Sequence, residues 1–172
     1  EAIVGAEANG LRLLELRVAI GDPVRAGQVL ATFADATIQA DVALARANLL
    51  ESQAVAQEAS GNATRARSLK DSGALSAQQI NQYLTQEQTG KARVASAKAQ
   101  LDAQLLRLKN TQLLAPDSGV ISARMATAGS VVGAGTEMFK LIRQGRLEWR
   151  GEVTSAELGR ITTGTSVLVT AP

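Results

Sequence analysis

The side chains that could carry out chemistry in this chain are hydroxyls, amines and carboxylates, because its 172 residues include no His and no Cys. The chain therefore has no imidazole base, no thiolate nucleophile and no usual set of zinc, copper or haem ligands. Acidic pairs such as Asp71 with Glu58, or Glu152 with Glu157, could form acid–base dyads, but no pattern places either pair in one pocket. We expect no catalytic residues, no metal site and no enzyme activity.

Glycine-rich turns are the next candidates, because such loops can hold phosphate groups. Gly21, Gly27, Gly129 and Gly135 are not followed by the Lys-Ser/Thr of a P-loop, and none opens a helix after a strand in the dinucleotide pattern. We expect these glycines to form turns with positive φ, with no cofactor bound. Scattered basic residues and only four aromatic side chains also argue against nucleic acid as a partner.

The composition describes a folded chain with a thin core. It is 45% hydrophobic and 20% charged, with a net charge of +2, yet only 2% is aromatic. No apolar stretch approaches the roughly 20 residues that span a bilayer. Because the chain begins at Glu1, we expect a mature or trimmed piece of a longer protein, in which any membrane anchor lies in segments absent here.

Two long helices are predicted, from about residue 37 to 70 and from about 77 to 109, where Gly, Pro and aromatic residues are scarce. In the first, apolar or small residues recur at alternating spacings of four and three, which is the seam of a coiled coil. The nine seam positions are Ile38, Val42, Ala45, Leu49, Ser52, Ala56, Ala59, Ala63 and Ala66. Five of these nine residues are Ala, so the helices can approach closely. Leu44, Leu50 and Val55 lie off this seam and are expected to contact neighbouring protomers or a partner.

The second helix has a less regular pattern, because Glu87 and Gly90 interrupt its apolar positions. Those positions are Ile80, Tyr83, Val94, Ala97, Leu101, Leu105 and Leu108. Two helices of equal length joined by residues 71–75 predict an antiparallel hairpin. Gly73 suits the end of the first helix, and Ser76 with Gln79 forms the pattern of a capping box at the start of the second.

The segments on either side of the hairpin read as short strands and turns, and they repeat. Gly21, Val24, Gly27 and Leu30 match Gly129, Val132, Gly135 and Met138 at a constant offset of 108 residues. Strands are expected at 11–16, 18–20, 28–33, 113–116 and 119–121. The hairpin is therefore an insertion between two related β-rich halves.

The pattern Gly-Asp-x-Val-x-x-Gly-Gln-x-Leu over residues 21–30 resembles half of a biotinyl or lipoyl domain. Its interruption by a helical hairpin, and the return at Leu114-Ala-Pro-Asp-Ser-Gly-Val-Ile121, resemble the periplasmic adaptors, or membrane fusion proteins, of tripartite multidrug efflux pumps, HlyD-like and of the RND type. The resemblance implies an α+β multi-domain chain: a lipoyl-like β-sandwich in halves 1–35 and 112–143, split by an antiparallel coiled-coil hairpin at 36–111 with its tip near 71–75. Residues 144–172, which include Leu147–Val153, would begin a β-barrel domain.

The resemblance also implies partners and a location. Adaptors that dock on TolC-type outer-membrane channels carry Arg, Leu and Ser at spacings of four and seven around the tip, which Arg65, Leu69 and Ser76 match. We expect these residues to dock on such a channel, an RND-type transporter of the inner membrane to be the other partner, and a hexamer to form in the pump. The location implied is the periplasm of a Gram-negative bacterium, at the inner membrane.

Three alternatives stay open. The pump could be of the ABC type, or it could export metals, although the absence of His and Cys disfavours the latter. A lipoyl or biotin carrier domain of an enzyme is a different class of function, but such carriers modify a Lys at the turn that the hairpin replaces here. A coiled-coil scaffold unrelated to transport would have no affinity for a TolC-type channel.

Overall fold

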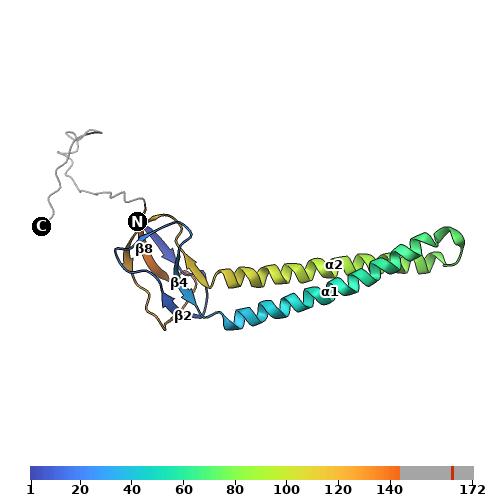
Figure 1. The fold of residues 1–172 in the computed structure, drawn as a ribbon, viewed down its shortest axis with the longest axis horizontal. Helices are drawn as coiled ribbons and strands as arrows, with labels where there is room; N and C mark the ends of the chain where they lie inside the picture. Colours follow the sequence, from blue (N-terminus) through green and yellow to red (C-terminus); the bar gives the residue numbers. More distant parts are fainter. Residues whose placement is uncertain (144–163, 165–172) are drawn as a thin grey trace, which may run out of the picture.

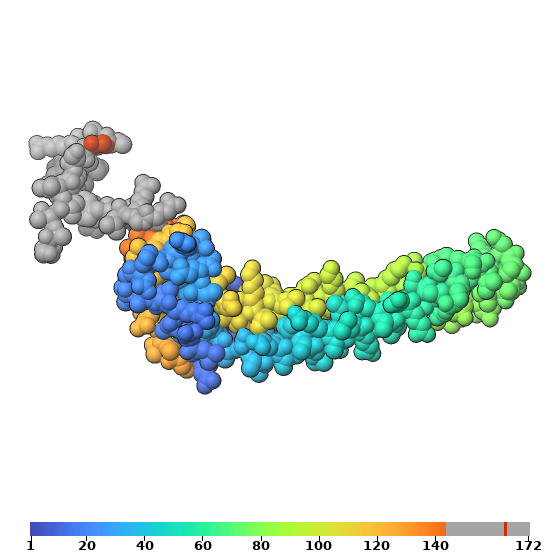
Figure 2. Space-filling model, viewed as in Figure 1, coloured from blue at the N-terminus to red at the C-terminus, as the bar shows by residue number. Residues whose placement is uncertain are grey.

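The computed structural model describes residues 1–143 and Gly164. Within residues 1–143, short β-strands gather at one end, and two long helices extend from them side by side (Figure 1). The space-filling view in Figure 2 shows the same part as a rounded base with a long, narrow arm. The predicted barrel segment, 144–172, lies outside the described residues apart from Gly164.

The arm is the predicted antiparallel hairpin. Helix α1 spans Ala36–Ser68 and α2 spans Ala77–Lys109, each 33 residues long. At 1.5 Å per residue, each helix is about 50 Å long. Helix α1 ends slightly earlier than expected, because the chain tightens into the 3₁₀ turn η1, Lys70–Ser72, before Gly73 reverses it with a φ of 72°. A positive φ without strain is the property for which Gly is favoured at this position.

The predicted seam of α1 faces α2 as expected, since all nine of its residues are buried or half-buried. The interpretation of α2 was wrong in one respect: Glu87 and Gly90 do not interrupt its buried face but belong to it. A Cβ added at Gly90 would lie 3.0 Å from Cα of Ala56 on α1. The helices approach so closely here that α2 has no room for a side chain.

Two four-stranded antiparallel sheets form the base. One sheet has the order β1-β8-β6-β3, and the other has the order β5-β4-β2-β7. The strands are β1 Ala2–Gly5, β2 Leu11–Leu16, β3 Pro23–Val24, β4 Val29–Phe33, β5 Gln112–Leu114, β6 Gly119–Arg124, β7 Val131–Val132 and β8 Glu137–Arg143. Each sheet combines strands from before and after the hairpin.

The internal repeat is visible in three dimensions. Gly21 and Gly129 have φ values of 91° and 87°, and Gly27 and Gly135 have values of 78° and 79°. Hydrogen bonds repeat at the same offset: the Gly21 N–H donates to the Ile121 carbonyl, and the Gly129 N–H donates to the Leu13 carbonyl, both at 2.8 Å. The offset relates β1 to β5, β2 to β6, β3 to β7 and β4 to β8. Replacing each strand by its counterpart converts the order of one sheet, β1-β8-β6-β3, into that of the other, β5-β4-β2-β7. The glycines form turns, as predicted.

One core lies between the two sheets, and it is built almost entirely from aliphatic side chains. Leu13 and Leu30 from one sheet and Ile121, Phe139 and Leu141 from the other are buried in a single cluster. Some of the strand predictions were wrong. Residues 18–20 run into a turn instead of forming a strand. Strands β1 and β8 were not predicted: β1 has only four residues, too few for an alternating pattern to stand out, and the segment of β8 was interpreted as turns.

Candidate functional site

The tip of the hairpin contains the three residues predicted to dock on a channel. Arg65 lies in the last turn of α1, Leu69 is the C-cap of that helix, and Ser76 is the N-cap of α2. All three are exposed, and the fold places them around the end of the arm that lies farthest from the sheets (Figure 1). We define the tip as residues 65–76.

Ser76 has a structural role of its own. Its Oγ accepts a hydrogen bond from the backbone N–H of Gln79 at 3.3 Å, and its own N–H donates to Oε1 of Gln79 at 2.9 Å. This reciprocal pair is the predicted capping box, which satisfies donors that the first turn of a helix leaves without partners. The hydroxyl hydrogen of Ser76 is not used by the cap, so it can still donate to a partner.

Arg65 and Leu69 present a charge and an apolar group beside this cap. Arg65 donates from Nη2 to Oδ1 of Asn62 at 2.5 Å, on its own helix. The side chain of Leu69 is not absorbed into the seam, since the residue remains 40% exposed. Arg65, Leu69 and Ser76 therefore offer a cation, an apolar side chain and a hydroxyl to a partner of the tip.

A buried charge lies below the tip, between the helices. Glu87 on α2 is 5% exposed, and its carboxylate accepts hydrogen bonds from three groups. Arg67 on α1 donates to Oε2 from across the helix pair, Lys91 donates to Oε1 at 2.8 Å from the next turn of α2, and Ser60 on α1 donates to Oε1 at 3.4 Å. We call these four residues the Glu87 cluster.

Hydrogen bonds from Lys91 and then from Arg67 hold the pKa of Glu87 below its ordinary value of 4.5, although burial opposes them. Glu87 is thus charged at neutral pH. This cluster was not predicted from the sequence, because Glu87 interrupts the apolar pattern of α2 there. The signal available was the spacing of four between Glu87 and Lys91, which suits an ion pair on one helix face.

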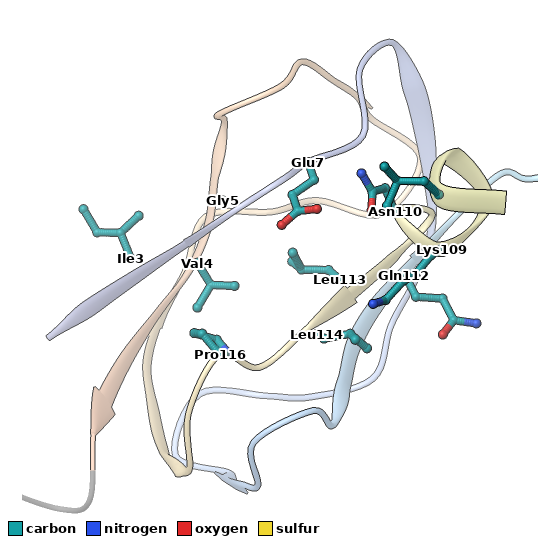
Figure 3. A pocket seen from close by; sticks show the side chains of 11 residues that line it. Ile3, Val4, Gly5, Glu7, Lys109, Asn110, Gln112, Leu113, Leu114 and Pro116 are labelled. Atoms are coloured by element: carbon teal, nitrogen blue, oxygen red, sulfur yellow. The ribbon is translucent and has the colours of Figure 1, made fainter. Parts of the chain in front are cut away.

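An open pocket of about 400 Å³ lies at the base of the arm, where α2 meets the edge strands β1 and β5. Figure 3 shows Val4, Leu113 and Pro116 between the strands, with Glu7 and Asn110 towards the end of α2. Its lining mixes apolar side chains with one carboxylate and one ammonium group, and it lacks a paired nucleophile and base. The pocket is not arranged for catalysis.

Neither a metal cluster nor a membrane span is found in the part of the chain that the structure describes. There, no group of three or more Asp and Glu side chains is placed to hold a metal ion. Both described helices are too polar to cross a bilayer.

Comparison with curated proteins identifies relatives among efflux proteins. The chain is 34% identical over 130 residues to the efflux pump periplasmic linker BepD of Brucella suis, covering 76% of this chain and 32% of BepD. It is 30% identical over 134 residues to the multidrug efflux pump subunit AcrA of Escherichia coli K12, covering 78% and 34%. The nickel-cobalt-cadmium resistance protein NccB of Alcaligenes xylosoxydans xylosoxydans is 28% identical over 171 residues, covering 98% and 42%.

Solved structures share the fold. The membrane fusion protein Spr0693 of Streptococcus pneumoniae R6 matches with a TM-score of 0.66 at 22% identity, over 88% of this chain and 62% of that one. A chimera of MacA with the α-hairpin domain of Pseudomonas aeruginosa MexA matches with a TM-score of 0.55 at 27% identity, over 83% and 47%.

No protein-family model matches the chain. The chain spans between 32% and 42% of the length of the curated relatives named above. The match to NccB, over 98% of this chain, nevertheless includes the hairpin together with the sheets that carry it. The chain belongs to the periplasmic adaptor family, the membrane fusion proteins of efflux pumps.

Proposed function

We propose that this chain is the hairpin-bearing part of a periplasmic adaptor that joins an RND-type transporter of the inner membrane to a TolC-type outer-membrane channel. Its role would be to transmit contact between the two, without chemistry of its own. The observation that carries the proposal is the tip, 65–76, which exposes Arg65, Leu69 and Ser76 and is held about 50 Å from the base by a paired helical arm.

The domain roles form part of the same proposal. Residues 1–35 and 112–143 would be the two halves of a lipoyl-like sandwich, 36–111 the hairpin, and 144–172 the start of a barrel domain. Support for the sandwich comes from the two sheets over one core and from the repeat that relates them. The adaptor as a whole would work in the periplasm at the inner membrane.

The tip would dock through its three exposed residues. The guanidinium of Arg65 keeps its charge at any physiological pH and donates in a planar fork, which suits the free carbonyl groups at the ends of partner helices. Leu69 would insert among apolar side chains of a helical channel tip, and Ser76 would donate a hydrogen bond while its cap remains intact. These three contacts together favour a partner that presents helix ends.

Self-association into a hexamer would bring the arms together. Leu44, Leu50 and Val55 are exposed along α1 at 63%, 66% and 44%. Apolar side chains in these positions do not stabilise the isolated hairpin. They are suited to contacts between neighbouring protomers.

A metal-exporting pump is the second candidate function, because NccB matches along almost the whole chain. The described residues offer no ligand cluster for a metal. In that pump the adaptor would therefore play the same mechanical role, and the transporter would select the metal. The transporter could also be of the ABC type.

The experiment that tests the docking role uses Arg65→Asp in the full-length protein. We expect this variant to fold, to lose binding to immobilised TolC-type channel and to fail in restoring drug resistance to a strain that lacks the adaptor. Thr64→Asp, which introduces the same carboxylate one residue away and keeps Arg65, is the control. Unchanged binding and resistance with Arg65→Asp would refute the docking assignment. Repeating the resistance assay with nickel, cobalt and cadmium salts separates the drug-exporting pump from the metal-exporting one.

A further inference from the structure

In the outer half of the hairpin, α1 contributes only small side chains to the seam. On α1 the last four seam positions, Ala56, Ala59, Ala63 and Ala66, are all Ala, and Gly90 faces Ala56. The larger seam residues of α1, Ile38, Val42 and Leu49, all lie in its inner half. A row of identical small residues defines the rotation of one helix on another poorly, because neighbouring positions offer the same surface.

The sheets at the base cannot fix the rotation of α1 on α2 in the outer half of the hairpin. Helix α1 follows β4 after two residues, and β5 follows α2 after two residues, so the sheets hold the inner ends firmly. Helices of this length bend along their course, however. The position of the last turn of α1 on α2 must therefore be set near the tip itself.

The cross-helix pair of Glu87 and Arg67 is placed to do this. Side chains on a helix tilt towards its N-terminus, which lies at the base for α1 and at the tip for α2. Arg67 therefore extends inwards along the pair and Glu87 extends outwards, and the two meet. Lys91 and Ser60 both donate to the other carboxylate oxygen, Oε1, so the carboxylate is buried with its charge compensated.

We propose that Glu87 and Arg67 are positioning residues, which form a clamp that fixes the separation and rotation of the last turns of α1 on α2. This proposal rests on the docking function proposed above. Arg65 and Arg67 lie about 100° to either side of the seam residue Ala66. Holding Arg67 against α2 directs Arg65 to the opposite flank, where it donates to Asn62 of its own helix and stays exposed to a partner.

Spin labels can test the clamp, because the 172 residues contain no Cys. Thr64→Cys on α1 and Gln82→Cys on α2 are exposed positions for a label pair in the full-length protein, with any Cys outside these residues replaced by Ser. The perturbation is Glu87→Gln, which keeps the size of the side chain and removes its charge. The matched control is Lys91→Gln, which removes a bond within α2 and leaves the cross-helix pair.

We expect a single narrow distance distribution in the parent and in Lys91→Gln, and a broader distribution shifted to longer distances in Glu87→Gln. Binding to immobilised TolC-type channel should weaken in proportion to the displaced fraction, about tenfold if roughly nine-tenths of the hairpins are displaced. Exchanging the charges with Arg67→Glu and Glu87→Arg, in the Lys91→Gln background, should restore both readouts.

Three outcomes would overturn the proposal: an unchanged distribution in Glu87→Gln, a broadened distribution with unchanged channel binding, or no rescue by the exchanged pair. Failure of the docking function itself is recognised separately, because Arg65→Asp would then leave binding unchanged while the clamp is intact.

Discussion

Replacing each of the two glycines in the helices by Ala should have different effects on stability. Gly61 in α1 and Gly90 in α2 both lie within regular helix, where Ala is favoured over Gly by about 1 kcal/mol. At Gly61 a new Cβ would contact only Nη1 of Arg65, at 3.6 Å, which is an ordinary contact with the end of a flexible side chain. Gly61→Ala should therefore raise the free energy of unfolding by about 0.5–1 kcal/mol.

At Gly90 the same methyl group would lie 3.0 Å from Cα and 3.3 Å from Cβ of Ala56. The backbone of α1 cannot move aside as a side chain can, so the helices must separate. Overpacking of this kind costs about 1–3 kcal/mol. After the gain in helix propensity, Gly90→Ala should leave the free energy of unfolding between unchanged and about 2 kcal/mol lower.

Urea unfolding followed by circular dichroism at 222 nm measures this difference, because the hairpin contributes nearly all of the helix in residues 1–143. Both variants replace Gly by Ala within a helix, so each serves as the control for the other. If Gly90→Ala stabilises the hairpin as much as Gly61→Ala does, the helices do not approach closely at Ala56, and the account of the outer seam is refuted.

Three further predictions concern the Glu87 cluster, the cap and the turns. Because the pKa of Glu87 is lowered on folding, its stabilising contribution is complete above about pH 4.5 and is lost as the pH falls through the folded value. The difference in urea midpoint between the parent and Glu87→Gln should therefore shrink from pH 7 to pH 3, and a constant difference would exclude charge as its cause. Ser76→Ala should lower the free energy of unfolding by about 1 kcal/mol, whereas Ser76→Asp should keep the cap; equal losses in both would show that the capping box contributes nothing. Gly129→Ala should cost about 1–2 kcal/mol because φ is 87° there, and Gly133→Ala, at a glycine without positive φ, should cost less by the same urea assay.

The hairpin shows how far sequence patterns lead. The spacing of apolar residues in α1 predicted every seam position, because burial along a helix repeats with the helix period, and Ser76 with Gln79 predicted the start of α2. The same reasoning failed at Glu87 and Gly90, since it assumes that a buried face is made of apolar side chains of ordinary size. A charge can be buried when its partners are supplied, and a glycine can be buried when two backbones meet.

The strands show the same limit. The repeated glycines predicted two related halves, and the matching φ values confirm them. The repeat did not indicate that each sheet would take strands from both halves, with β1 beside β8 and β5 beside β4. Arg65, Leu69 and Ser76 were named from the resemblance to adaptors that dock on TolC-type channels, and their docking role stays a prediction.

The sequence by itself determined the local features: two helices of equal length, the seam between them, the caps and the glycine turns. Each of these depends on residues within a few positions of one another, where periodicity and backbone preference act. The tertiary structure alone decided which distant groups meet: Arg67 with Glu87 across the hairpin, Gly90 against Ala56, and strands of one half in the sheet of the other. Such contacts depend on how closely two surfaces can approach and on whether a buried charge has hydrogen-bond partners. The spacing of residues within one segment predicts neither of these.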